Sequence, residues 1–116
     1  MRKISRDAGN AFLSKRYFKR DNTRVLRGSE TRIDGRVEAT TVMVLFGNKI
    51  ALMDSTGTIA VNFCGYTTQT TKDRINALLQ LLNVQGKFSQ KNFGLRYNGT
   101  PVDSREWFIV RKGEAQ

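Results

Sequence analysis

The strongest constraint on the fold is a run of strand-forming residues near the middle of the chain. Val37–Phe46 is rich in β-branched and apolar residues, and Ile50–Met53 resumes the same pattern after Gly47-Asn48, a dipeptide typical of tight turns. Together these segments predict an antiparallel hairpin. Because apolar side chains fall on both sides of Val37–Phe46, we expect both faces of this strand to be partly covered.

Further strands are predicted on each side of this hairpin. Thr23–Arg27 reads as an earlier strand, and Thr58–Phe63 as a third strand of the meander. The turn-forming residues of Gly28–Glu30 and Asp34-Gly35 separate the early strand from the hairpin. We therefore predict an antiparallel β-meander over residues 23–64.

Residues 70–83 carry the clearest helical pattern. Four apolar residues recur at i, i+3, i+4 and i+7, namely Ile75, Leu78, Leu79 and Leu82. Thr70 is the predicted N-cap, and Asp73 three residues later resembles the second member of a capping box. This spacing predicts an amphipathic helix that packs on the sheet.

The two ends of the chain complete the predicted architecture. Ser5 can cap a short helix that ends at about Lys15. Residues 93–111 predict a β-hairpin, with a turn at Asn98-Gly99 and a last strand at Trp107–Val110. At 116 residues the chain fits one α+β domain, with an N-terminal helix, an antiparallel β-meander, one amphipathic helix and a C-terminal hairpin.

Positive charge is concentrated near the N-terminus. Residues 1–36 hold eleven basic and four acidic residues, a net charge of +7 out of +10 for the whole chain. Such a field raises the local concentration of polyanions and speeds their encounter. Solubility alone gives no reason for this placement, so we expect a partner that is acidic.

Within this region, four cations surround two aromatic residues in the segment Lys15–Arg20. Lysine and arginine neutralise phosphates, and an exposed Tyr17 can stack on an unpaired base. Phe18 is expected instead to anchor the N-terminal helix in the core. Thr70-Thr71 can hold a phosphate at the helix start, although plain capping explains the same residues. The candidate binding residues are Arg2, Lys3, Arg6, Lys15, Arg16, Tyr17, Lys19, Arg20, Arg24, Arg27, Lys72 and Arg74.

The composition argues against catalysis and against metal or cofactor binding. The chain has no histidine and one cysteine, and its carboxylates are scattered, so no metal set and no acid–base pair can be assigned. We expect Cys64 to be a small buried hydrophobe rather than a nucleophile. No phosphate-binding glycine motif is present. The longest apolar stretches are too short to cross a bilayer, so we expect no membrane partner.

Several segments in a fixed order resemble small proteins of tailed bacteriophages. They comprise Ala11-Phe12, Phe18–Thr23, Phe46–Ala51, Gly65-Tyr66, Thr70–Leu79, Ser89–Asn92 and Tyr97–Gly99. In that family, His often stands at the position of Phe46 and Trp at that of Tyr66. The resemblance covers most of residues 3–100 and implies a phage origin, an α+β fold and action in the cytoplasm of an infected bacterium. It implies no particular activity.

Two main hypotheses for function remain open from the sequence. The first is a non-catalytic accessory protein that binds DNA or RNA, mainly through phosphate contacts. The second is a modulator that binds an acidic host protein, such as a polymerase, a nuclease or a defence component, because a basic surface serves both uses. A minor virion component is a third hypothesis. An exposed edge strand also predicts a homodimer through the sheet edge.

Overall fold

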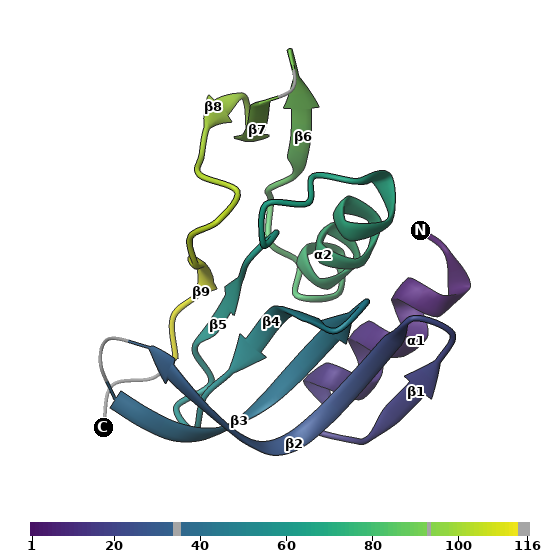
Figure 1. Ribbon diagram of the computed structural model, residues 1–116, viewed down its shortest axis with the longest axis vertical. Coiled ribbons are helices and arrows are strands. Elements are labelled where there is room, and N and C mark those ends of the chain that lie inside the picture. Colours follow the sequence, from purple (N-terminus) through teal and green to yellow (C-terminus); the bar gives the residue numbers. More distant parts are fainter. Residues whose placement is uncertain (34–35, 93, 114–116) are drawn as a thin grey trace.

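The computed structural model describes residues 1–33, 36–92 and 94–113, and for 29–33 and 36–40 it describes the strands without their side chains. Its elements, shown in Figure 1, are α1 (Lys3–Leu13), β1 (Phe18–Arg20), β2 (Thr23–Ile33), β3 (Arg36–Leu45), β4 (Asn48–Met53), β5 (Ile59–Val61), α2 (Gln69–Leu81), β6 (Phe88–Lys91), β7 (Gly94–Tyr97), β8 (Thr100–Pro101) and β9 (Phe108–Arg111). The architecture is α+β, which confirms the predicted class. Among the described residues, no helix is long and apolar enough to cross a membrane.

The main sheet has six antiparallel strands in the order β1-β2-β3-β4-β5-β9. The strands β2 to β5 follow one another as the predicted meander. Both faces of β3 are covered where its side chains are described. Met43 and Leu45 lie in the main core, while Val42 and Val44 form a second buried cluster with Leu52 and Ala60 that Leu26 and Trp107 flank.

Two details of the meander differ from the prediction. Strand β2 continues past Arg27 to Ile33, because a β-bulge at Gly28 absorbs the expected turn, with Gly28 at a φ of 75° and the register shifting between Arg27 and Ser29. The predicted turn at Asp34-Gly35 lies outside the described residues. The turn between β3 and β4 is Phe46-Gly47 rather than Gly47-Asn48, since Leu45 pairs with Asn48.

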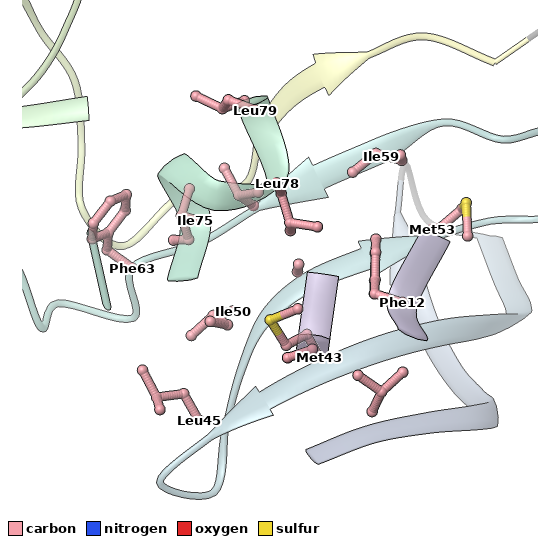
Figure 2. Packing of buried hydrophobic residues seen from close by; sticks show 14 of the residues in the cluster. Phe12, Met43, Leu45, Ile50, Met53, Ile59, Phe63, Ile75, Leu78 and Leu79 are labelled. Carbon is pink, nitrogen blue, oxygen red and sulfur yellow. The ribbon is translucent and has the colours of Figure 1, made fainter. Parts of the chain in front are cut away.

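Both helices cover one face of the main sheet (Figure 2). Phe12 of α1 and Ile75, Leu78 and Leu79 of α2 lie in one buried cluster with apolar residues of β2 to β5. Burial of such side chains contributes about 1.5–3 kcal/mol each. Gly9 lies where α1 crosses α2, because a Cβ atom there would lie 2.6 Å from Cδ1 of Leu81. This close approach explains a glycine inside the helix.

The predicted caps of both helices are wrong. The N-cap of α1 is Arg2, which makes no capping hydrogen bond through its side chain, and Ser5 is buried inside the helix. The N-cap of α2 is Thr68, whose Oγ1 accepts a hydrogen bond from the backbone N–H of Thr71 at 3.2 Å. A run rich in threonine offers several equivalent caps, and the structure uses the earlier one.

The C-terminal third also differs from a simple hairpin. The strands β6, β7 and β8 form a separate three-stranded sheet, and Asn98-Gly99 is the turn between β7 and β8 as predicted. The last strand, β9, instead pairs with β5 and forms an edge of the main sheet. Four aromatic rings join the two sheets, with adjacent ring centroids 4.8–5.5 Å apart, and they belong to Phe63, Phe88, Tyr97 and Phe108.

Candidate nucleic-acid interface

The position of the segment Lys15–Arg20, which we call the basic-aromatic arm, follows from the way in which α1 ends. The helix stops at Leu13, and Lys15 adopts a left-handed conformation with a φ of 56°. The backbone N–H of Arg16 then donates to the carbonyl of Ala11 at 2.8 Å. This reversal fixes the backbone of the arm and leads it into β1. The Tyr17 side chain, at the outside of the bend, is 69% exposed.

Strand β1 sorts the arm into a buried side and an exposed side. Phe18 pairs with Val25 and packs against the main core, as predicted for an anchor. Lys19 pairs with Arg24, and both side chains are exposed. Phe18 is therefore a structural residue, while Tyr17 and Lys19 are free to meet a partner.

The pairing of Lys19 with Arg24 places two like charges directly opposite each other. Side chains at such positions have Cβ atoms about 4.5–5.5 Å apart, and like charges there are destabilising. Neither side chain forms an ion pair with any carboxylate in the part of the chain that the structure describes. A bound anion between them would relieve this repulsion.

Two open hollows meet at Tyr17. One, of about 530 Å³, is lined by Lys15, Tyr17, Arg27, Gly28, Thr41, Met53, Asp54 and Ser55. The other, of about 330 Å³, is lined by Tyr17, Phe18, Lys19, Arg24, Val25 and Leu26. The first contains the carboxylate of Asp54, which accepts hydrogen bonds from Thr56 and Thr58. The second has no acidic residue among its described lining. We call Lys15, Tyr17, Lys19, Arg24 and Arg27 the Tyr17 surface.

Arg20 lies beside this surface, but its charge is partly neutralised. Its Nη1 atom lies 2.8 Å from Oδ2 of Asp7 in α1, and its guanidinium lies 5.2 Å from the centroid of the Phe18 ring. The hydrogen bond from Arg20 holds the pKa of the Asp7 carboxyl below its ordinary value. Arg20 thus ties β1 to α1 as well as adding charge. Arg16 is exposed and forms no ion pair with any described residue.

Three predicted cations lie on the outside of α1, and one lies on α2. Arg2, Lys3 and Arg6 are exposed along the first turns of α1, and Lys72 is half-buried near the start of α2. None of them lines either hollow at Tyr17. They contribute to the overall positive field but not to the local geometry of the Tyr17 surface.

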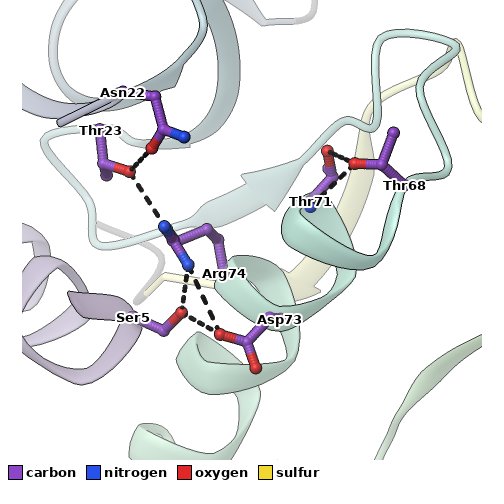
Figure 3. Close-up of polar contacts among 7 residues, drawn as sticks. All are labelled: Ser5, Asn22, Thr23, Thr68, Thr71, Asp73 and Arg74. Carbon is purple, nitrogen blue, oxygen red and sulfur yellow. Dashed lines mark hydrogen bonds and ion pairs between the residues drawn. The ribbon is translucent and has the colours of Figure 1, made fainter. Parts of the chain in front are cut away.

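The prediction that Arg74 is a binding residue is wrong, because Arg74 is buried with 2% exposure. Figure 3 shows its side chain among polar groups of α1, β2 and α2. Its Nε donates to Oγ1 of Thr23 at 3.1 Å, and its Nη1 donates to Oγ of Ser5 at 2.7 Å. The same Nη1 lies 3.5 Å from Oδ2 of Asp73, which also accepts a hydrogen bond from Ser5. Burial lowers the pKa of the Arg74 guanidinium. Arg74 therefore connects α1, β2 and α2 and is removed from the candidate binding residues.

The structure gives the threonines at the start of α2 a capping role, which weakens the hypothesis of a phosphate at Thr70-Thr71. Figure 3 shows that Thr68 and Thr71 bond to each other through both the hydroxyls and the Thr71 backbone N–H. One of the free N–H groups at this helix start is thus already satisfied by the cap. Plain capping, by Thr68, accounts for the threonines here.

Cys64 is partly buried, and its thiol donates to the backbone carbonyl of Lys49 at 3.3 Å. Burial raises the pKa of this thiol, which lowers the fraction of reactive thiolate at neutral pH.

Two exposed aromatic residues that the sequence interpretation did not select are Phe46 and Tyr66, with 68% and 59% exposure. The signal for Phe46 was its place beside the predicted tight turn.

The fold and this surface define a small, basic α+β protein with exposed cations on one strand pair and an exposed aromatic ring directly before it. Residues 1–113 match the Kyanoviridae Gp96 protein family, so the chain belongs to this family of tailed-phage proteins. The match confirms the phage origin that the sequence pattern implied. No curated protein and no solved structure gives a significant match.

Proposed function

We propose that this phage protein is a non-catalytic accessory protein that binds nucleic acid through the Tyr17 surface, in the cytoplasm of the infected host. The observation that supports the proposal most strongly is the pairing of Lys19 with Arg24. These cations face each other without a carboxylate partner among the described residues, and exposed Tyr17 stands beside them. A phosphate backbone supplies the missing negative charge, and a base supplies a ring for Tyr17.

Binding of this kind depends on salt in a characteristic way. Each neutralised phosphate releases counterions, so the logarithm of the binding constant falls linearly with the logarithm of the salt concentration. The slope counts contacts, with about 0.7–0.9 for each phosphate that is neutralised. Fluorescence anisotropy with a labelled single-stranded oligonucleotide measures the binding constant at each salt concentration.

The test variant is Lys19→Gln combined with Arg24→Gln, and we expect its salt slope to be smaller than the wild-type slope by about 1.5. The matched control removes two exposed cations at the two ends of β6, as Lys87→Gln with Lys91→Gln, and should leave the slope unchanged. Negligible binding of the wild-type protein at low salt would remove the proposal.

The same pair of variants tests the rival hypothesis of an acidic host protein. Affinity purification from infected cells, after nuclease treatment, should leave no stoichiometric protein partner if nucleic acid is the ligand. A protein that persists, and that the Lys19→Gln and Arg24→Gln variant loses, would replace the proposal with the rival. The edges of the main sheet are the short strands β1 and β9, and a homodimer through either edge remains a prediction.

A further inference from the structure

The turn between β3 and β4 presents an aromatic ring in an unfavourable backbone conformation. Phe46 and Gly47 have φ values of 51° and 81°, a left-handed pair for which asparagine and glycine are preferred. The Phe46 side chain is 68% exposed, so core packing does not compensate for this conformation. Strain of this kind at an exposed residue points to a function for the side chain.

A second loop with a fixed backbone carries the exposed side chain of Tyr66. Cys64 and Gly65 are also left-handed, with φ values of 56° and 80°. The N–H of Gly65 donates to the carbonyl of Ser104, and that of Tyr66 donates to the carbonyl of Phe63, both at 2.9 Å. The turn opposite is held as well, since the N–H of Phe46 donates to the carbonyl of Asn22 at 2.9 Å. Both exposed rings are therefore carried by loops with fixed backbones.

Between these loops lies a cleft of about 290 Å³. It is lined by Leu45, Phe46, Asn48, Ile50, Phe63, Tyr66, Thr68 and Thr71, and we call it the Phe46–Tyr66 cleft. Its volume lies near the lower end of ligand pockets, which suits one small ring system. The side-chain amide of Asn48 has no hydrogen-bond partner among the described residues, so it offers both a donor and an acceptor.

A row of cations runs from the Tyr17 surface toward the turn that carries Phe46. Lys19 pairs with Arg24, Arg24 with Val44, and Val44 with Lys49, so these side chains share one face of the sheet. Lys19, Arg24 and Lys49 are all exposed. From β1 to β4 the row spans about 14 Å at the usual strand spacing. The row ends at Lys49, on the face of the sheet opposite the helices, whereas Leu45 and Ile50 of the cleft lie on the helix-covered face. A strand that follows the row therefore reaches the cleft around the turn between β3 and β4, and Lys72 follows Thr71 on the far wall of the cleft.

We infer that the Phe46–Tyr66 cleft holds an unpaired nucleobase of a single strand whose phosphates follow the row Lys19, Arg24 and Lys49 and then pass around the turn between β3 and β4. The inference rests on the proposed function and adds a preference for unpaired over duplex nucleic acid. A nucleotide matches the cleft and the row together, because its base has a face for stacking and an edge for the Asn48 amide, and its phosphate carries a negative charge. A protein partner would need an aromatic side chain for the cleft and separate carboxylates for the row, whereas each nucleotide carries both a base and a phosphate.

The test compares a single-stranded thymidine oligonucleotide with an abasic strand of the same length, which keeps the phosphates and lacks the bases. We expect the wild-type protein to bind the thymidine strand at least about fivefold more tightly than the abasic strand. Phe46→Asn removes the ring while favouring the left-handed turn, so it should fold. With Phe46→Asn or Tyr66→Ser, we expect this preference to fall at least about threefold while the salt slope stays unchanged, and stacking on Tyr17 accounts for the preference that remains.

The outcomes separate this inference from the proposed function. An unchanged preference in both variants overturns the inference alone. Equal binding of the two strands by the wild-type protein overturns the inference together with stacking on Tyr17, but leaves the phosphate contacts of the proposed function. Absence of binding to either strand at low salt overturns the proposed function as well. A protein partner that survives nuclease treatment and is lost with Phe46→Asn would assign the cleft to an aromatic side chain instead.

Discussion

Replacing Arg74 with methionine tests whether this residue has a structural role. The guanidinium donates to Ser5 and Thr23 at 2.7 and 3.1 Å and lies 3.5 Å from the carboxylate of Asp73. Methionine keeps much of the apolar volume of the side chain and removes all three contacts. The perturbation therefore separates the polar network from the packing of the stem.

The structure sets the size of the effect. Hydrogen bonds that involve a charged group contribute about 1.5–3 kcal/mol each, so two lost bonds cost about 3–6 kcal/mol before compensation. Removing a buried charge also removes its desolvation penalty, which offsets part of this loss. Ser5 still donates to Asp73 and Thr23 still donates to Asn22, so neither hydroxyl is left without a partner. We expect a net loss of about 2 kcal/mol in the free energy of unfolding.

Urea unfolding, followed by far-ultraviolet circular dichroism, measures this loss. Arg74→Ala opens a cavity in addition, and we expect it to cost about 4 kcal/mol. The oligonucleotide affinity of folded Arg74→Met should match that of Lys87→Gln, another variant that lacks one positive charge. A methionine variant as stable as the wild type, or more stable, would refute the claim that this network stabilises the fold.

Three further predictions follow from local contacts. Gly86→Ala should lower the free energy of unfolding by about 1–3 kcal/mol, because the new Cβ would lie 1.9 Å from the Tyr97 hydroxyl, whereas Gly94→Ala, with its nearest contact at 3.4 Å, should change it little. Thr68→Ala should cost about 1 kcal/mol as the loss of an N-cap and Thr70→Ala much less; equal costs would contradict the cap assignment. In an NMR titration the pKa of Asp7 should lie below its ordinary value and should rise in Arg20→Gln; an unchanged pKa in the variant would contradict the assigned cause. The ion pair therefore contributes to stability above the unfolded-state pKa of Asp7, and this contribution is lost as pH falls through the folded-state pKa.

Local patterns in the sequence predicted much of the fold. The meander and α2 follow from periodicity within short windows, and the anchoring role of Phe18 is expected of an apolar aromatic residue within a basic segment. The pairing of β9 with β5 could not be predicted in the same way, because it joins segments far apart in the chain. Strand order at that distance depends on packing rather than on local pattern.

The candidate site likewise contains residues that a short segment of sequence predicts and residues that only strand pairing brings together. Lys19 and Tyr17 could be selected from the sequence because both lie in one short basic segment. The charge of Arg74 predicts an exposed side chain, but its helical position predicts a buried one, because it lies four residues before Leu78 on the buried face of α2. The row from Lys19 through Arg24 to Lys49 was beyond sequence reasoning, since its members come from three strands whose register only the structure provides.

Mapping backbone amide shifts by NMR while adding a single-stranded oligonucleotide at low salt tests the central claim most directly. The account predicts that the largest shifts fall on Lys15–Arg20 and Arg24–Arg27, with Phe46 and Tyr66 following when the strand carries bases. Shifts confined to the small sheet of β6 to β8, or no shifts at all, would contradict it.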